Sequence, residues 1–279
     1  MNRYLKLVNF EFNRIAKVYF VLLAILLISQ IAGVIFSSKN YLNETNRMIY
    51  EELIPKAEYL SRYGPMSMDQ VLSSIWFIGP MALCVALVAF YIFLIWYRDW
   101  FGKNTFIYRL LMLPTARLNV FLAKITTILL MTFGFVAFQL ILYPIESTIL
   151  KWMVPKEFRV DLSVHELISS SGFLELNIIF PNSIIEFILN YGAGFVAVTI
   201  LFTAIMFERS YRIKGILLGI GYSILAVIIF FAPIIIQEFL QRYYLYPSEI
   251  LIVEVAMGII VTCCSIWVSN YLLKKKIRI

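Results

Sequence analysis

The chain has little of the chemistry that most enzymes use, since its 279 residues include one histidine and three cysteines. Cys84, Cys263 and Cys264 all lie in apolar runs, where a thiol behaves as a small hydrophobic side chain. No CxxC pair and no cluster of cysteine with histidine occurs, so neither a disulfide framework nor a metal site is expected. His165 lies outside any HExxH pattern and is expected to be an ordinary surface residue.

Motifs for nucleotide hydrolysis and for nucleophilic catalysis are absent as well. The sequence has no G-x-x-x-x-G-K-[ST] loop, so the chain is not expected to hydrolyse ATP by itself. It has no G-x-S-x-G pattern, and a single histidine leaves little machinery for general acid–base catalysis. Glu51-Glu52 is similar to the glutamate pair of intramembrane CAAX-type proteases, but it lies in a polar segment without intramembrane histidines. We therefore predict no enzyme activity, no catalytic residue, no metal and no bound cofactor.

Charged residues are scarce, at 15%, whereas hydrophobic residues make up 61% of the chain. Soluble domains have about 25% charged and about 45–50% apolar residues, so this composition indicates a polytopic membrane protein. Six apolar runs are long enough to cross about 30 Å of hydrocarbon. The predicted fold is one all-α domain over residues 1–279, with spans at residues 18–36, 75–96, 120–141, 185–206, 216–236 and 250–273. Residues 37–74 and 142–184 then form the two external loops.

The charges of the two signs are unevenly distributed along the chain. Sixteen of the 24 Lys and Arg residues lie before the first span, in residues 97–124, in residues 207–214 or in the C-terminal tail. Only three of the 17 acidic residues, Glu11, Asp99 and Glu208, lie in these same segments. The positive-inside rule places these segments and both termini in the cytoplasm of a bacterial cell. The net charge of +7 is therefore a topology signal, and no nucleic-acid partner is expected.

Residues 2–17 predict an amphipathic helix lying in the membrane interface, in contact with lipids. The reading as the start of a signal peptide is less favoured, because about 19 apolar residues follow and Ser37-Ser38-Lys39 is no A-x-A-type cleavage site. One face of the predicted helix carries Leu5, Val8, Phe12 and Ile15, and Arg3, Lys6, Arg14 and Lys17 surround it.

The segment of residues 98–117 lies between the second and third spans and is too polar to lie in lipid. Pro114 is expected to end a short helix here, and Thr115 can cap the helix that follows. A short amphipathic cytoplasmic helix of this kind is suited to receive another protein. Its apolar residues Phe106, Ile107, Leu110, Leu111 and Leu113 recur at helical spacing, and Lys103, Asn104 and Arg109 fall elsewhere around the helix.

Two acidic residues, Glu186 and Glu254, lie inside predicted spans near their outer ends. Carboxylates near helix N-termini are stabilised by the helix dipole, so an ordinary structural role is one interpretation. The other adds Glu238 and Glu249 and predicts an acidic outer vestibule that attracts cationic amphiphiles.

The order of these parts resembles the permease subunits of bacterial ABC-2 type transporters, also called type V exporters. The local match is Thr105-Phe106-Ile107-Tyr108-Arg109-Leu110-Leu111-Met112-Leu113-Pro114-Thr115-Ala116-Arg117, followed by Phe121-Leu122-Ala123-Lys124. This is similar to the family's leucine-proline segment that leads into the third span. The resemblance leaves open whether residues 237–249 re-enter the membrane.

The resemblance implies that residues 102–114 form a coupling helix that docks on a separate cytoplasmic ABC ATPase. Two such ATPase subunits, which use ATP and Mg, would act on two permeases, either identical or paired with a similar chain. The implied cargo is an amphipathic or hydrophobic substrate, such as an antimicrobial peptide or a drug, moved outward. The implied coupling residues are Arg98, Asp99, Gly102, Thr105, Phe106, Tyr108, Arg109, Leu110, Leu111, Leu113 and Pro114.

Two other functions remain open from the residues alone. A secondary transporter would bind its coupling ion through the intramembrane carboxylates. A sensor or scaffold that transports nothing would bind a ligand through the outer loops.

Overall fold

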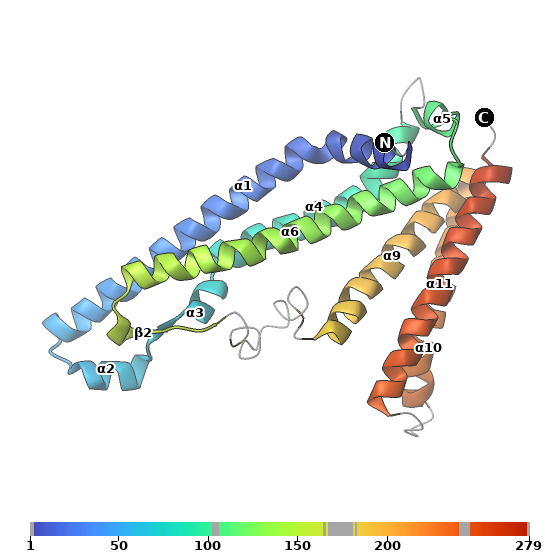
Figure 1. Ribbon diagram of the computed structural model, residues 1–279. Helices are drawn as coiled ribbons and strands as arrows, with labels where there is room; N and C mark the ends of the chain where they lie inside the picture. The colour runs from blue at the N-terminus through green and yellow to red at the C-terminus, as the bar shows by residue number, and fades with distance from the viewer. Residues whose placement is uncertain are drawn as a thin grey trace. The chain divides into compact units, whose positions relative to one another are not determined.

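The computed structural model describes residues 3–101, 106–163, 166, 181, 183–239 and 246–277. Gly102, Thr105 and His165 lie outside the described residues, as do residues 167–180 of the second expected external loop and residues 240–245. The described part is dominated by six long helices (Figure 1). They are α1 (Arg3–Asn46), α4 (Ile75–Trp100), α6 (Arg117–Met153), α9 (Ile184–Tyr211), α10 (Ile213–Phe239) and α11 (Pro247–Lys275).

All six long helices are long and apolar enough to cross a membrane. The shortest, α4, has 26 residues and is therefore about 39 Å long at about 1.5 Å per residue. Each expected span falls within one of these helices, which confirms the all-α class and six candidate membrane-spanning helices. The expected external loops begin as continuations of α1 and α6, because α1 runs on to Asn46 and α6 runs on to Met153.

The N-terminal segment and the first span form one uninterrupted helix, α1. The expected interfacial residues 2–17 thus lead into residues 18–36 without a turn between them. The location of residues 2–17 in the membrane interface stays a prediction.

The chain divides into two compact units. Unit one contains Met1–Arg14, Phe90–Leu130 and Ser183–Ile279, and unit two contains Ile15–Ala89 and Met131–Asn182. The helices α1, α4 and α6 contribute residues to both units. The prediction of a single domain is not tested by this division.

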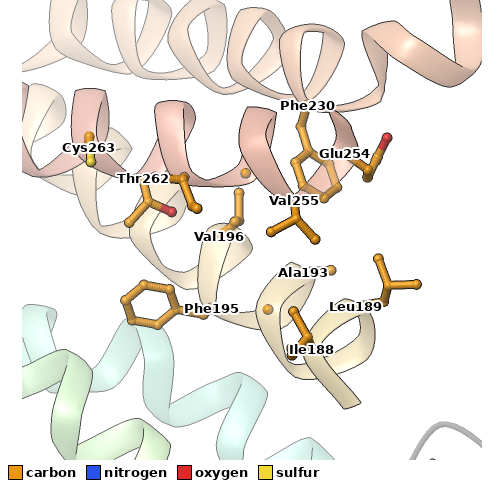
Figure 2. A pocket seen from close by; sticks show the side chains of 13 residues that line it. Ile188, Leu189, Ala193, Phe195, Val196, Phe230, Glu254, Val255, Thr262 and Cys263 are labelled. Atoms are coloured by element: carbon orange, nitrogen blue, oxygen red, sulfur yellow. The ribbon is translucent and has the colours of Figure 1, made fainter. Parts of the chain in front are cut away.

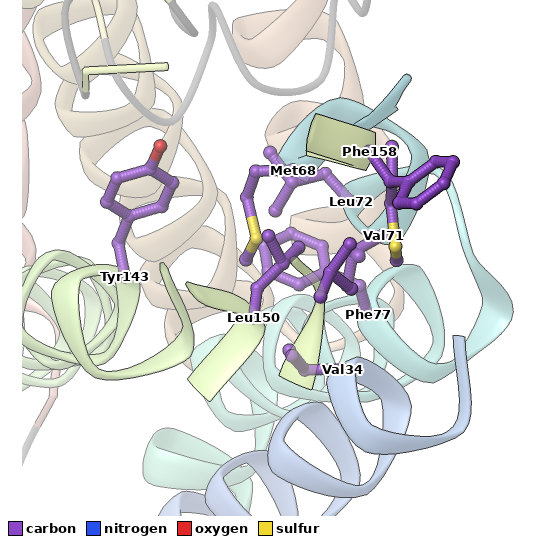
Figure 3. Close-up of a cluster of buried hydrophobic side chains, with 10 residues drawn as sticks. Val34, Met68, Val71, Leu72, Phe77, Tyr143, Leu150 and Phe158 are labelled. Carbon is purple, nitrogen blue, oxygen red and sulfur yellow. The ribbon is translucent and has the colours of Figure 1, made fainter. Parts of the chain in front are cut away.

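Unit two contains a small folded layer beside its long helices. This layer consists of a π-helical turn (Arg47–Glu51), α2 (Lys56–Tyr63), α3 (Met68–Leu72), a 3-10 turn (Lys156–Phe158) and two short strands. The strands β1 (Met66–Ser67) and β2 (Arg159–Val160) pair in parallel, with Met66 opposite Arg159. Apolar side chains from the layer and the helices form one core (Figure 3). Its buried members are Val34, Met66, Met68, Val71, Leu72, Phe77, Tyr143, Leu150, Val154 and Phe158.

Unit one contains a bundle of α9, α10 and α11. A single residue, Arg212, joins α9 to α10 and has a positive φ of 54°. The helices α9 and α10 approach closely because Gly215 and Gly219 of α10 carry no side chain. A Cβ on Gly215 would overlap the carbonyl oxygen of Phe207, and one on Gly219 would lie 2.9 Å from the carbonyl oxygen of Ala204.

Hydrogen bonds between hydroxyl groups also join the bundle. The Thr203 and Ser269 hydroxyls lie 3.0 Å apart, and those of Tyr222 and Ser265 lie 2.7 Å apart. Each pair links α11 to another helix of the bundle. Such bonds satisfy polar groups that have no access to water within a bilayer.

Candidate functional site

A short helix, α5 (Phe106–Leu111), lies in the link between α4 and α6. Its residues Ile107, Leu110 and Leu111 are buried within the chain. The opposite side exposes Arg109, and Met112 in the following turn is 65% exposed. Of the apolar face predicted from the sequence, Ile107, Leu110 and Leu111 therefore pack inside the chain, whereas Leu113 is exposed.

Of the remaining predicted coupling residues near α5, some pack inside the chain and others are exposed. Phe106 stacks on Phe10 of α1 with 5.7 Å between ring centroids, and Tyr108 contacts the ring of Trp100. Leu113 and Pro114 follow α5 and are exposed. Phe106 and Tyr108 thus hold α5 in place, whereas Leu113 and Pro114 extend its open surface.

Three segments of unit one converge at one end, which we call the basic end: residues 3–14, residues 106–117 of the link and residues 272–277 of the C-terminal tail (Figure 1). Arg3 Nη1 donates a hydrogen bond to the Pro114 carbonyl at 2.5 Å. Arg117 Nη1 donates to the carbonyl of Leu273 at 2.7 Å and to that of Ile277 at 3.2 Å. The N-terminal stretch and the tail are therefore both attached to the link that carries α5.

Beneath α5 lies a group of buried charges, which we call the ion cluster: Glu11, Asp99 and Lys124, with Arg14 and Arg98 at its rim. Lys124 Nζ lies 2.7 Å from Glu11 Oε1 and 2.5 Å from Asp99 Oδ2, and it also donates to the Ile95 carbonyl at 2.8 Å. All three central side chains are at most 2% exposed. Lys124 thus joins α1, α4 and α6 through charge-assisted hydrogen bonds.

The two rim arginines complete the pairing of the carboxylates. Arg14 Nη1 lies 2.6 Å from Asp99 Oδ1, and Arg98 Nη2 lies 3.4 Å from Glu11 Oε2. The Arg14 guanidinium also lies 5.3 Å from the centre of the Phe106 ring. One side chain therefore connects the ion cluster directly to α5.

Asp99 and Arg98 form ion pairs inside the chain. Both were expected at the polar edges of the coupling helix, but Asp99 is fully buried against Lys124. Lys124 and Glu11 were absent from the predicted site. One feature of the sequence could have pointed to Glu11 as a site residue. Glu11, Asp99 and Glu208 are the only acidic residues in the segments that hold sixteen basic ones.

Glu208 also has a defined partner at the basic end. Its carboxylate accepts a hydrogen bond from the Tyr97 hydroxyl, which joins α9 to α4. The neighbouring Arg209 lies 4.6 Å from the centre of the Tyr97 ring and 5.6 Å from that of Trp100. The end of α9 is therefore attached to the end of α4, directly before the link.

One local prediction is wrong. Thr115 was expected to cap α6, but its hydroxyl is buried and has no hydrogen-bond partner. Instead, the Asn119 amide bonds to the Ala116 carbonyl at 2.8 Å, and α6 begins at Arg117. The turn after α5 is fixed by backbone bonds and by Arg3 rather than by a side-chain cap.

The four predicted vestibule residues lie in different surroundings. Glu186 is in the first turn of α9, where its amide donates to the Ser183 hydroxyl at 3.2 Å. The Glu249 carboxylate accepts from the Tyr246 amide at 2.8 Å and so caps α11, and Glu238 is exposed near the end of α10. Glu254 alone is buried, with 6% of its side chain exposed, and its Oε2 has no hydrogen-bond partner.

Glu254 lines a largely apolar pocket of about 320 Å³ within the bundle of α9, α10 and α11, and Thr262 adds a hydroxyl group to the lining (Figure 2). Other lining residues include Ile188, Gly192, Phe195, Phe230 and Cys263. Figure 2 shows Glu254 toward one end of the pocket and Cys263 toward the other. In the described part of the chain, no group of three His, Cys, Asp or Glu side chains could hold a metal ion.

The six apolar helices define the chain as a multi-pass α-helical membrane protein. No protein-family profile, no curated protein and no solved structure matches it.

Proposed function

We propose that the chain is the membrane-spanning permease subunit of an ATP-driven exporter of the ABC-2 type. The observation that carries this proposal is the construction of α5. One side of this helix is buried against unit one, and the other presents Arg109, Met112 and Leu113 outside the chain. A helix that is held from within and open on one side can transmit a force from a bound protein.

The ion cluster supports the same proposal. Arg14 contacts both Phe106 and Asp99, and Asp99 is paired with Lys124 in the second turn of α6. A displacement of α5 is therefore passed to α1, α4 and α6 through short, charged contacts. Packed interiors transmit such displacements because they have low compressibility.

The partner in this proposal is a cytoplasmic ABC ATPase, of which two copies act on two permease chains. The basic end faces the cytoplasm by the positive-inside rule. Arg109 gives the open surface of α5 a positive charge, so the docking cleft of the ATPase is expected to carry acidic residues beside an apolar depression. Amphipathic compounds are the expected cargo, because the helices offer apolar surface and few charges.

Co-purification with an ATPase encoded beside this gene tests the proposal. The double variant Arg109→Glu and Met112→Asp changes only the open side of α5. We expect it to lower both the amount of co-purified ATPase and ATP-dependent export at least about tenfold, which corresponds to about 1.4 kcal/mol of binding free energy.

The matched control is the double variant Lys151→Glu and Trp152→Asp, which makes the same kinds of change at exposed positions near the far end of α6. It should keep the ATPase and export at the level of the unchanged chain. A chain that purifies without any ATPase in a mild detergent, or equal losses in both double variants, would contradict the proposal.

A secondary transporter is the second candidate, because two buried carboxylates offer sites for a coupling ion. Glu254 has one oxygen without a hydrogen-bond partner, and Glu146 of α6 is fully buried with neither oxygen partnered. Proteoliposomes that contain this chain alone distinguish the two. Substrate movement driven by an ion gradient, and lost in Glu254→Gln or Glu146→Gln, would favour the second candidate over the first.

A further inference from the structure

The pocket in the bundle of α9, α10 and α11 is large enough to hold one small molecule. Its two ends along α11 are marked by Glu254 and Cys263, which are nine residues apart and therefore about 13 Å apart along the helix. Its volume of about 320 Å³ lies at the lower end of the range for ligand pockets, about 300–1,000 Å³. All of its lining residues belong to unit one.

The chemistry of the pocket selects a cation with an apolar body. Glu254 is the only acidic or basic residue in its lining, and it is more than nine-tenths buried with an unpartnered carboxylate oxygen. A buried carboxylate without a partner is costly, and a bound positive charge removes that cost. The rings of Phe195 and Phe230 in the same lining also favour a cation over an anion or a neutral molecule.

The pocket can be entered from outside the chain. Ile188 and Ile259 lie in its lining and are 47% and 60% exposed. Gly192 and Gly258 place no side chain in the pocket, and at Gly192 an added Cβ would meet no atom within 4 Å. A hydrophobic ion that has partitioned into the bilayer can therefore reach Glu254 laterally, along an apolar path.

We propose that this pocket binds a monovalent lipophilic cation, whose charge lies at Glu254 and whose apolar body extends along α9 and α11 toward Cys263. If the chain is the exporter proposed above, lipophilic cations are a class of its substrates. That conclusion rests on the proposed function, whereas binding of the cation to the pocket does not. The four predicted vestibule residues then differ in role: Glu254 binds the charge, Glu186 and Glu249 stabilise helix ends, and Glu238 lies outside the pocket.

Binding is measured on the full purified chain in nanodiscs of phosphatidylcholine, with empty nanodiscs subtracted. The probe is tetraphenylphosphonium, and tetraphenylborate serves as an anion of the same shape. We expect saturable binding of the cation to one site per chain and no saturable binding of the anion. Glu254→Gln should raise the Kd of the cation at least about tenfold, whereas Glu238→Gln, at an exposed position outside the pocket, should leave it within about twofold.

Two glycine variants test the location independently of charge. Gly192→Leu places a side chain in the pocket, and Gly194→Leu adds the same side chain on the same helix outside the lining. Neither glycine has an atom within 4 Å of an added Cβ, so both variants are expected to fold, as thermal unfolding of the nanodisc samples will verify. Gly192→Leu should abolish saturable binding, and Gly194→Leu should not.

Equal binding of the borate would show that the pocket takes any apolar body, such as a lipid acyl chain, and would overturn the proposal. It would also be overturned by no saturable cation binding, by an unchanged Kd in Glu254→Gln, or by equal effects of the two leucine variants. Because the assay contains no ATPase, its failure is separate from a failure of the chain to co-purify with one.

Discussion

Lys124 shows how this protein tolerates an ion inside a helical membrane structure. Moving a single charge out of water costs several kcal/mol even after relaxation, so a buried lysine is stable only with close partners. Lys124 has two carboxylates within 2.7 Å, and these carboxylates are in turn paired with Arg14 and Arg98. The cluster has three positive and two negative members, so its interactions depend on every member being present.

The removal of Lys124 should therefore destabilise the protein more than the loss of a surface charge. Lys124→Met leaves Glu11 and Asp99 buried with only rim partners, which is expected to cost about 3–5 kcal/mol of unfolding free energy. This loss is measured by thermal unfolding in detergent, with the fraction of protein that stays folded as the readout. Adding Asp99→Asn to Lys124→Met should restore part of the stability, because it removes a fully buried charge that keeps only the rim partner Arg14.

Lys151→Met is the control, since Lys151 lies on the same helix and is exposed. It should change stability by no more than about 0.5 kcal/mol. If Lys124→Met unfolds at the same temperature as Lys151→Met, the ion cluster does not stabilise the basic end.

The sequence shows Glu11, Asp99 and Glu208 as rare acidic residues in otherwise basic segments. It could not pair them. Glu11 and Lys124 are 113 positions apart, and their contact depends on how α1 and α6 pack. Composition and local spacing carry no information about such a contact.

Among the helices, the tight packing of α9 against α10 depends on two glycines spaced four residues apart. Gly215 and Gly219 lie on the same side of α10 and both face the backbone of α9. Such a G-x-x-x-G spacing is visible in the sequence and could have been used to predict this close approach. The preceding Arg212, with its positive φ, lets the chain reverse direction within one residue.

A matched pair of alanine variants tests this packing. Gly215→Ala forces a methyl group against the carbonyl of Phe207 and should lower the stability of the bundle by about 1–3 kcal/mol. Gly221→Ala on the same helix meets no atom within 4 Å and should be neutral or stabilise the helix by up to about 1 kcal/mol. Thermal unfolding of both variants measures the difference, and the reverse order of stability would contradict this account of the α9–α10 contact.

The helices themselves were largely predictable. Apolar runs gave the six spans, and helical spacing together with Pro114 located the short helix before α6. The sequence did not reveal which side of α5 is buried, because an apolar stripe is equally consistent with a partner and with the chain itself. The packing of Phe106 on Phe10 decides this, and it requires the N-terminal residues to lie beside the link.

In unit two, parts of the expected external loops are folded structure rather than simple connections between spans. Met66, Met68, Val71 and Phe158 lie in predicted loop regions, yet they are buried in a common core with residues of the long helices. Their apolar character was visible in the sequence, but the parallel pairing of β1 with β2 joins segments more than ninety positions apart. The described part of these segments is therefore a folded layer attached to the ends of the spans.

The orientation of the whole molecule is the prediction that remains most directly testable, because it rests on charge distribution. Residues 62 and 109 are separated along the chain by α4, and both carry exposed arginines. We expect them on opposite sides of the membrane, with residue 62 outside. In a background without Cys84, Cys263 and Cys264, Arg62→Cys and Arg109→Cys provide matched sites for a membrane-impermeant maleimide. The surface ion pair of Arg62 with Glu58 contributes little, so its loss should not disturb the fold.

In intact spheroplasts the reagent should label the Arg62→Cys variant and spare the Arg109→Cys variant, which should react only after the membrane is opened. The reverse pattern would place α5 outside, where no ATP-hydrolysing partner could reach it, and would contradict the proposed exporter. Labelling of both variants in intact spheroplasts would mean that α4 does not cross the membrane. Because one net crossing separates the two positions, a single labelling experiment tests the assignment of α4, the positive-inside orientation and the access of α5 to a cytoplasmic ATPase.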